Sequence, residues 1–375
     1  MMKCTSRREF VRLAVGAGMA AGCTRKVGDS TRATADASTA ASPSSSATPA
    51  RSARVHVARG KDLAGITRAA LDSLGGIGMV VKAGDRVFLK PNMVTLPWAD
   101  MWDPFTSGEC TKPEVVVAVA EACLEAGAAA VTIGDGSQRP RFDWARAHTL
   151  DGSTNLVEEA GRLEKRHGRP VKLACLEVDT PEWIEVPTRN SYGKVAVSSL
   201  ALHADKVISI PVAKTHRYAY FTLSLKNFVG VTALARYQGG TERNDRWRLH
   251  ARDMSPLAFN TLPQDIARAV KPVLAVIDFS IGMEGDGPSV YEGGLPLDVS
   301  RRVGDFRVLA SKDLVAADST AARIMSQDEA RIQEVLGMAR ADGLGAMHAE
   351  EITVVGGTLE TLRIPWKAAR PQNAG

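Results

Sequence analysis

The chain has 375 residues, of which 45% are hydrophobic and 5% aromatic, enough for a large core in one domain or in two lobes. Its formal net charge of +5 is concentrated near the start, because residues 1–22 and 24–54 each carry +3 and leave −1 for the rest. A nearly neutral body with few aromatics removes the main argument for a nucleic-acid-binding protein.

Residues 1–22 are expected to be an export signal. Arg7 and Arg8 precede an apolar stretch that is too short to span a bilayer, and an ordinary anchor helix would need about 20 apolar residues. The stretch "SRREF" resembles a twin-arginine signal, and "MAAGC" resembles a lipoprotein cleavage box with Cys23 as the lipidated residue. The sequence therefore predicts a protein exported to the periplasmic side of the bacterial envelope and anchored there by lipid.

Residues 23–53 are rich in Ser, Thr, Ala and Pro and contain almost nothing to bury. Such a composition predicts a disordered tether, with a root-mean-square reach of roughly 30 Å. The folded body is expected over residues 54–360, followed by a C-terminal tail over 361–375.

Within the body, short apolar runs alternate with amphipathic segments. Strands are expected at 54–58, 85–90, 128–133, 171–178, 206–212, 272–279, 306–311 and 351–357. Helices are expected at 62–76, 114–127, 156–168, 262–270, 313–325 and 328–340, with capping boxes at Thr111/Glu114 and Thr261/Gln264. Strands that are apolar throughout and separated by helices predict an α/β fold, with a mostly parallel sheet and helices on both faces.

Two expected loops are longer than usual. One covers 91–113, and the other covers 236–256 and contains five arginines and His250. Long ordered loops are often lids or binding loops, but a mobile surface excursion is an equally good reading of each loop taken alone.

Polar residues follow four of the expected strands. The four clusters are Lys90 and Asn92; Asp135 and Ser137; Lys214, Thr215 and His216; and Asp278, Glu284 and Asp286. Each cluster alone has an ordinary structural explanation, such as a tight turn, a surface lysine or a hydrogen-bonded core histidine. In an open parallel sheet, however, ligands bind beyond the carboxyl ends of the strands, so four clusters at one edge favour a shared cleft.

The lysines of these clusters point to an anionic ligand. Lys90, Lys214 and, twelve residues further along, Lys226 offer positive charge to a carboxylate or phosphate. A lysine at a strand end is expected to support no core, so its replacement should weaken ligand binding and leave stability almost unchanged. His216 is a candidate general acid–base, or the ligand of a softer metal.

The acids suggest a cation. Asp278, Glu284 and Asp286 are predicted to hold a divalent metal, with Mg, Ca or Mn favoured by the oxygen ligands. Cysteine is sparse: Cys110, Cys123 and Cys175 show no C-x-x-C spacing, so the sequence contains no iron–sulfur or zinc-knuckle motif.

Several stretches together resemble a known family, the domain of unknown function 362. The resemblance covers roughly residues 55–360 and rests on "VFLKPNMV", on "VISIPVAKTH" followed by "LSLKNFVGV", on "LAVIDFSIGMEGDGP" and on "VLASKDLVAADSTAARIM". The positions that match the family are Lys90, Asn92, Asp135, Lys214, His216, Lys226, Asn227, Asp278, Glu284, Gly285, Gly287, Pro288, Asp313 and Asp318, and His250 resembles a further family histidine.

The chain departs from the family at two points. Some relatives carry a ferredoxin-type cysteine cluster that this chain lacks, and Cys110 and Thr111 stand where relatives often have two threonines. The turn "DGSQRP" also bears a slight resemblance to the Asp-x-Thr-Arg-Pro turn of nickel-pincer lactate racemases.

From residues and resemblance together, we expect Lys90, Lys214 and His216 to be catalytic. The ligand-binding residues are expected to be Asn92, Asp135, Ser137, Lys226, Asn227 and His250. The expected function is that of a metal- or cofactor-dependent enzyme acting on a small anionic substrate, and the alternative is a non-catalytic ligand-binding or redox-accessory lipoprotein. The expected partners are that small anion, a membrane through Cys23, and the twin-arginine export machinery.

Overall fold

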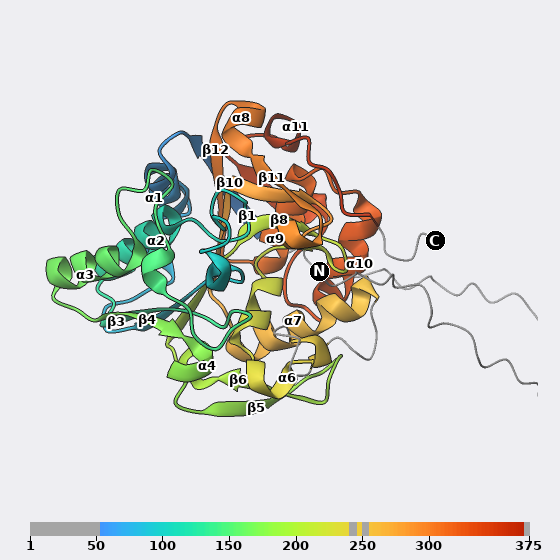
Figure 1. Ribbon diagram of the computed structural model, residues 1–375. Helices are drawn as coiled ribbons and strands as arrows, with labels where there is room; N and C mark the ends of the chain where they lie inside the picture. Colours follow the sequence, from blue (N-terminus) through green and yellow to red (C-terminus); the bar gives the residue numbers. More distant parts are fainter. Residues whose placement is uncertain (1–52, 240–245, 250–254, 371–375) are drawn as a thin grey trace, which may run out of the picture. The chain divides into compact units, whose positions relative to one another are not determined.

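An 11-stranded mixed sheet runs through the centre of the computed structural model (Figure 1), which describes residues 53–239, 246–249 and 255–370. The strand order is β13 (Ile352–Val355), β1 (Ala53–Gly60), β12 (Phe306–Ser311), β10 (Leu274–Gly285), β7 (Lys206–Ile210), β2 (Arg86–Pro91), β3 (Ala130–Asp135) and β4 (Val171–Cys175). From β10 to β4 every neighbouring pair in this order is parallel, whereas β12 is antiparallel to both neighbours. The prediction of a mostly parallel sheet is confirmed.

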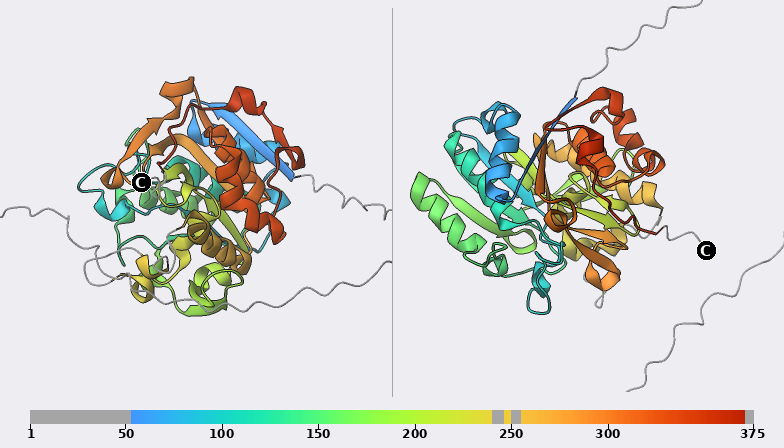
Figure 2. Two further views of the ribbon diagram at one scale, coloured as in Figure 1. Left: turned by 90° about the vertical axis from the view of Figure 1, so that its right-hand side faces the viewer. Right: turned by 90° about the horizontal axis from the view of Figure 1, so that it is seen from above.

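Helices cover both faces of this sheet, as expected (Figure 2). One face carries α1 (Leu63–Ser73), α2 (Pro113–Glu125) and α3 (Leu156–His167), and the other carries α7 (Pro256–Val270), α9 (Leu314–Ile324) and α10 (Glu329–Ala341). On β2, Phe88 and Leu89 are both fully buried, and they belong to the two different hydrophobic clusters. Successive side chains of a strand point to opposite faces, so a strand covered on both sides is apolar without alternation.

The remaining elements are short. The helices are α4 (Leu176–Asp179), α5 (Ser199–Leu202), α6 (Leu234–Tyr237), α8 (Val299–Val303) and α11 (Leu359–Leu362). A separate antiparallel hairpin is formed by β5 (Trp183–Pro187) and β6 (Lys194–Ser198). None of the helices in the described ranges has the length and apolar content needed to cross a membrane.

Besides β5 and β6, three strands were not expected from the sequence: β8 (Val212–His216), β9 (Tyr220–Thr222) and β11 (Gly294–Asp298). The strand β10 continues to Gly285, well beyond its expected end at 279, and both β8 and β11 pair with this extension. Lys214 and His216 therefore lie on a strand rather than in the polar turn that the sequence indicated. The apolar core pattern could not show this extension, because β8 and the end of β10 carry polar and small residues.

The two expected capping boxes do not form. The hydroxyl of Thr111 donates to the carbonyl oxygen of Ile210 at 2.7 Å, and the Glu114 carboxylate accepts from the amide of Leu150 at 2.6 Å. Both side chains thus join the start of α2 to neighbouring segments. The helix α7 begins before its expected box, and Ser255 is its N-cap.

Part of the expected C-terminal tail belongs to the body. Ile364 and Trp366 are buried, and the indole nitrogen of Trp366 donates to the carbonyl oxygen of Met283 at 2.9 Å. The carbonyl oxygen of Lys367 accepts from the amide of Gly285 at 2.8 Å. Isolated apolar residues without periodicity gave no signal for this packing.

Candidate functional site

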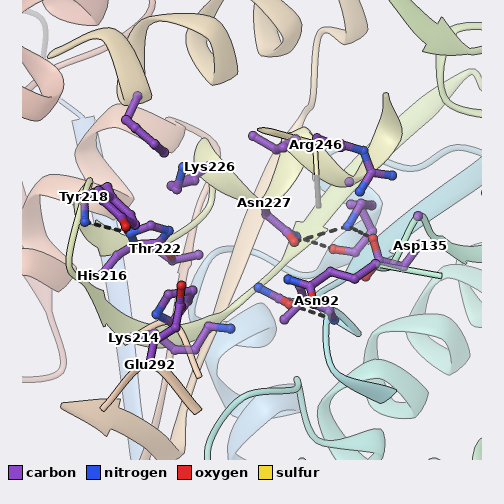
Figure 3. Close-up of a pocket in the computed structure, with 18 residues that line it drawn as sticks. Asn92, Asp135, Lys214, His216, Tyr218, Thr222, Lys226, Asn227, Arg246 and Glu292 are labelled. Carbon is purple, nitrogen blue, oxygen red and sulfur yellow. Dashed lines mark hydrogen bonds and ion pairs between the residues drawn. The ribbon is translucent and has the colours of Figure 1, made fainter. Parts of the chain in front are cut away.

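A pocket with a volume of about 200 Å³ lies at the edge of the sheet where β2 and β3 end (Figure 3). On β2, Lys90 follows Phe88 on the same face of the strand, and Asp135 is the last residue of β3. The strand β8 contributes Lys214 and His216. Residues of three of the four expected polar clusters thus line this pocket, and Asp278, Glu284 and Asp286 are not among its lining residues.

A buried ion pair forms one half of the pocket. The ammonium of Lys90 contacts the carboxylate of Asp135, and the two residues are only 0% and 2% exposed. Lys90 also donates to the side-chain oxygen of Asn227 at 3.3 Å, and Asn227 donates back to the carbonyl oxygen of Lys90 at 2.6 Å. Burial lowers the pKa of Lys90, and Asp135 opposes that shift. This lysine and this acid mainly neutralise each other.

Two glycines allow the backbone to approach this pair. A Cβ atom on Gly230 would overlap the Asp135 carboxylate and lie 2.9 Å from the Lys90 nitrogen. A Cβ atom on Gly136 would lie 2.6 Å from a guanidinium nitrogen of Arg246. Any side chain at either position would displace a charged group of the pocket wall.

Arg246 is a charged wall residue that no pattern in the sequence had singled out. It precedes the short 3₁₀ helix η5 (Trp247–Leu249), and its Nε and Nη1 atoms donate to the carbonyl oxygens of Thr232 at 3.0 Å and Ser137 at 3.1 Å. Its Nη2 atom is buried and has no hydrogen-bond partner within the described residues. Burial lowers the pKa of Arg246 to about 10, so the guanidinium stays charged at neutral pH.

The other half of the pocket combines His216 with two aromatic rings. The amides of Tyr218 and Ala219 donate to Nδ1 of His216, at 3.1 and 3.3 Å. A neutral imidazole with Nδ1 as acceptor carries its proton on Nε2. The rings of Tyr218 and Phe259 stack at 5.2 Å, and the imidazole lies 6.2 Å from the ring of Phe259.

Two lysines complete this half. Lys214 is 1% exposed and donates to the carbonyl oxygen of Glu109 at 2.7 Å, and burial lowers its pKa to about 8. Lys226 begins the 3₁₀ helix η4 (Lys226–Val231), and its ammonium nitrogen lies 5.1 Å from the ring centre of Phe259. Burial, and after it the charge of Lys214, lower the pKa of Lys226 to about 7.

The chain matches the family model described as "Domain of unknown function (DUF362)" over residues 87–323. This chain belongs to the DUF362 family. A curated relative, thylakoid-associated protein sll1697 of Synechocystis sp., is 31% identical over 281 residues, which cover 72% of this chain and 74% of the relative. The prediction made from the motifs is therefore confirmed at the level of the family.

Two solved structures are distantly similar to this DUF362 chain. The lactate racemase apoprotein of Thermoanaerobacterium thermosaccharolyticum is 12% identical with a TM-score of 0.32, and the match covers 60% of this chain and 50% of that one. A protein of Thermotoga maritima is 15% identical with a TM-score of 0.36, with 60% and 53% covered. The DUF362 chain thus spans about half the length of each, and neither likeness bears on its site.

The expected metal ligands do not come together in this DUF362 protein. Asp278 lies within β10, not at its end; it forms an ion pair with Lys112 at 3.6 Å and accepts from the hydroxyl of Ser280 at 2.6 Å. Lys112 and Asp278 are both fully buried, so they form a second internal ion pair that resembles the one beside the pocket.

The other two acids have partners elsewhere. Arg302 pairs with Glu284 at 3.2 Å, and Arg370 donates to Asp286 at 2.8 Å. Asp278 and Glu284 lie six residues apart on β10, and the pairing of β10 with β8 is irregular between Asp278 and Met283. Within the described residues no group of three or more His, Cys, Asp or Glu side chains is placed to hold a metal ion. The predicted shared metal site is therefore not formed by these three carboxylates.

The remaining predicted site residues have varied outcomes. Asn92 lines the pocket, with its side-chain oxygen accepting from the amide of Val94 at 3.2 Å. The hydroxyl of Ser137 instead donates to the carbonyl oxygen of Val94 at 2.7 Å, and Ser137 contributes its own carbonyl oxygen to Arg246. His250 and Cys23 lie outside the described residues.

Proposed function

We propose that this DUF362 protein is an enzyme that acts on a small anionic compound bound in the pocket. The observation that carries the proposal is a pair of buried polar atoms on the pocket wall, Nη2 of Arg246 and Oγ1 of Thr222, which have no hydrogen-bond partner in the described part of the chain. Buried polar atoms are nearly always paired, so two such atoms in residues that line one cavity favour a ligand with acceptor oxygens.

The balance of charge favours an anion. Lys90 is neutralised by Asp135, which leaves Lys214, Arg246 and the protonated form of Lys226 as cations on the wall. Glu292, on the 3₁₀ helix η6 (Val290–Glu292), is the remaining acid that lines the pocket. A carboxylate or phosphate would be held by charge-assisted hydrogen bonds that are stronger than neutral ones.

His216 supports catalysis rather than binding alone. Two backbone amides fix its ring through Nδ1, which sets the orientation of the imidazole on the pocket wall. Histidine is the side chain that most often transfers protons in enzymes, so an oriented His216 is the candidate for this role. An anchored histidine beside lysines of low pKa is an arrangement common at sites of proton transfer.

We further propose that the protein is exported and lipid-tethered at Cys23. The arginine pair and the cleavage box in the first 23 residues support this, and the name of the Synechocystis relative associates that protein with a membrane system. Twin-arginine export carries folded proteins, which suits a chain whose site is assembled from many strands before export.

The test is to follow the depletion of compounds from the anionic fraction of a metabolite extract by mass spectrometry. The wild-type protein is expected to deplete at least one anion, and His216→Gln is expected to leave that anion unchanged while still binding it. A wild-type protein that retains an anion without converting it would favour the alternative, a ligand-binding or redox-accessory lipoprotein. A His216→Gln variant with full turnover would contradict the acid–base role.

A further inference from the structure

The lysines around the pocket differ in their partners. Lys90 and Lys112 each have a carboxylate partner, and Lys214 donates to a main-chain carbonyl oxygen. Lys226, within the part of the chain that is described, has neither a hydrogen bond nor an ion pair, and its nitrogen lies over the ring of Phe259. Among the described residues, no carboxylate stabilises its charge.

We infer that Lys226 is a nucleophile that forms an imine with a small aldehyde or ketone carrying a carboxylate or phosphate. The inference rests on the proposed anion-binding function and adds to it a class of substrate and a covalent step. A lysine reacts with carbonyl compounds when its amine is neutral, which requires a desolvated position, a neighbouring cation and no carboxylate partner. Lys226 meets these conditions.

Two effects keep the amine neutral. Burial disfavours the ammonium form, and the charge of Lys214 acts in the same direction, so that the pKa of Lys226 falls to about 7. The face of the Phe259 ring acts in the opposite direction, because it favours the ammonium. At neutral pH about half of the molecules would carry the free amine.

The surroundings fit an imine-forming site. Lys226 and His216 both lie against Phe259, at 5.1 Å and 6.2 Å from its ring centre, and Figure 3 shows them in the same half of the pocket. Arg246 and Asn92 lie in the other half, where they would hold the anionic group of the substrate. The carbonyl carbon would then face the amine.

The step balances without a redox partner. The lone pair of the Lys226 nitrogen attacks the carbonyl carbon, and the carbonyl electrons move to oxygen to give a carbinolamine. The two protons that the nitrogen loses pass to the oxygen, which leaves as water as the carbon–nitrogen double bond forms, so no net proton is gained or lost.

The competing explanation is that Lys226 is only a cationic anchor for the anion. In that case it stays protonated and does not react with a carbonyl compound. The purified protein should be treated at pH 7 with glyoxylate and sodium cyanoborohydride, which reduces an imine to a stable carboxymethyl-lysine. Peptide mapping then compares Lys226 with the exposed Lys165 in the same sample.

Lys226 is expected to be modified at least about 100-fold faster than Lys165, because an ordinary exposed lysine, with a pKa of about 10.4, is almost fully protonated at pH 7. The rate at Lys226 should reach half its maximum near pH 7, whereas an ordinary exposed lysine becomes reactive only as the pH approaches about 10. Lys226→Arg keeps the positive charge and should abolish rapid labelling of the protein.

A Lys226 that reacts no faster than Lys165 overturns the inference. Binding of glyoxylate without reductant, measured by saturation-transfer NMR on wild type and Lys226→Arg, tests the anion-binding pocket separately from the nucleophile. If glyoxylate binds both proteins and no adduct forms, the nucleophile is rejected and the anion-binding pocket stands. If it neither binds nor reacts, the proposed anion site loses support as well.

Discussion

Replacement of Lys90 by methionine tests the buried ion pair beside the pocket. The lysine is fully buried and paired with Asp135, so Lys90→Met removes the partner of a charge that is only 2% exposed. Asp135 would retain one hydrogen bond, from the amide of Met93 at 2.6 Å. The sequence had suggested that a lysine at this position leaves stability unchanged, and its burial reverses that expectation.

The expected loss of unfolding free energy in Lys90→Met is large. Removing one partner of a buried ion pair typically costs about 3–5 kcal/mol, because the other charge is left uncompensated. The carbonyl oxygen of Pro91 and the side-chain oxygen of Asn227 would lose a donor at the same time. For a body of this size, such a loss corresponds to a fall in melting temperature of about 5–15 °C.

Urea unfolding, monitored by circular dichroism, measures this loss of unfolding free energy. Adding Asp135→Asn to Lys90→Met removes the uncompensated charge, so the double variant should recover stability, with a coupling of about 0.5–3 kcal/mol. Lys214→Met is the matched control, since Lys214 is equally buried but bonds only a main-chain carbonyl. A Lys90→Met variant as stable as Lys214→Met would refute the reasoning.

Three further predictions concern other charged groups. Lys226→Met should stabilise the protein more at pH 6 than at pH 9, because the pKa of Lys226 is about 7 in the folded protein and about 10.4 in the unfolded chain. The free-energy cost of burying the ammonium is therefore complete below pH 7 and disappears as pH rises toward 10. Urea melts that show an equal gain in unfolding free energy at both pH values would contradict this. Asp278→Asn should lower the melting temperature by the same amount with and without EDTA, because the partners of Asp278 are Lys112 and Ser280. If wild type and variant differ in melting temperature only when EDTA is absent, Asp278 holds a metal. In cell fractionation, the Cys23→Ala protein should be released from the membrane or remain unprocessed. Replacement of both signal arginines by lysine should leave the protein in the cytoplasm. Unchanged membrane attachment of the Cys23→Ala protein would reject the lipid anchor.

Several pocket residues could be predicted from the sequence, because the end of an apolar strand is marked by a change to polar residues. Parallel strands such as β2 and β3 place their carboxyl ends at one edge of the sheet, so Lys90 and Asp135 had to meet there. The same reasoning brought in Lys214 and His216, although these lie on an extra strand. What the sequence could not show is that Lys90 and Asp135 pair with each other, since pairing depends on side-chain directions across two strands.

The three predicted metal ligands are not grouped in the described structure, for a related reason. Asp278 and Glu284 seemed to lie in one loop, but an extension of β10 through polar and glycine residues separates them along a strand. Arg246 was missed because its loop has neither periodicity nor a motif, so nothing distinguished it from the other arginines there. Lys112 looked like a residue next to a helix start, and only the structure pairs it with Asp278.

The central claim is that the lysine-lined pocket binds a small anion. The most direct measurement is equilibrium dialysis of the protein against a metabolite extract, with bound compounds identified by mass spectrometry for wild type and Lys214→Met. Loss of a charge-assisted hydrogen bond costs about 1.5–3 kcal/mol, so an anionic compound should be enriched by wild type and bound at least about 10-fold more weakly by the variant. Enrichment of no anion, or equal enrichment by both proteins, would contradict the claim.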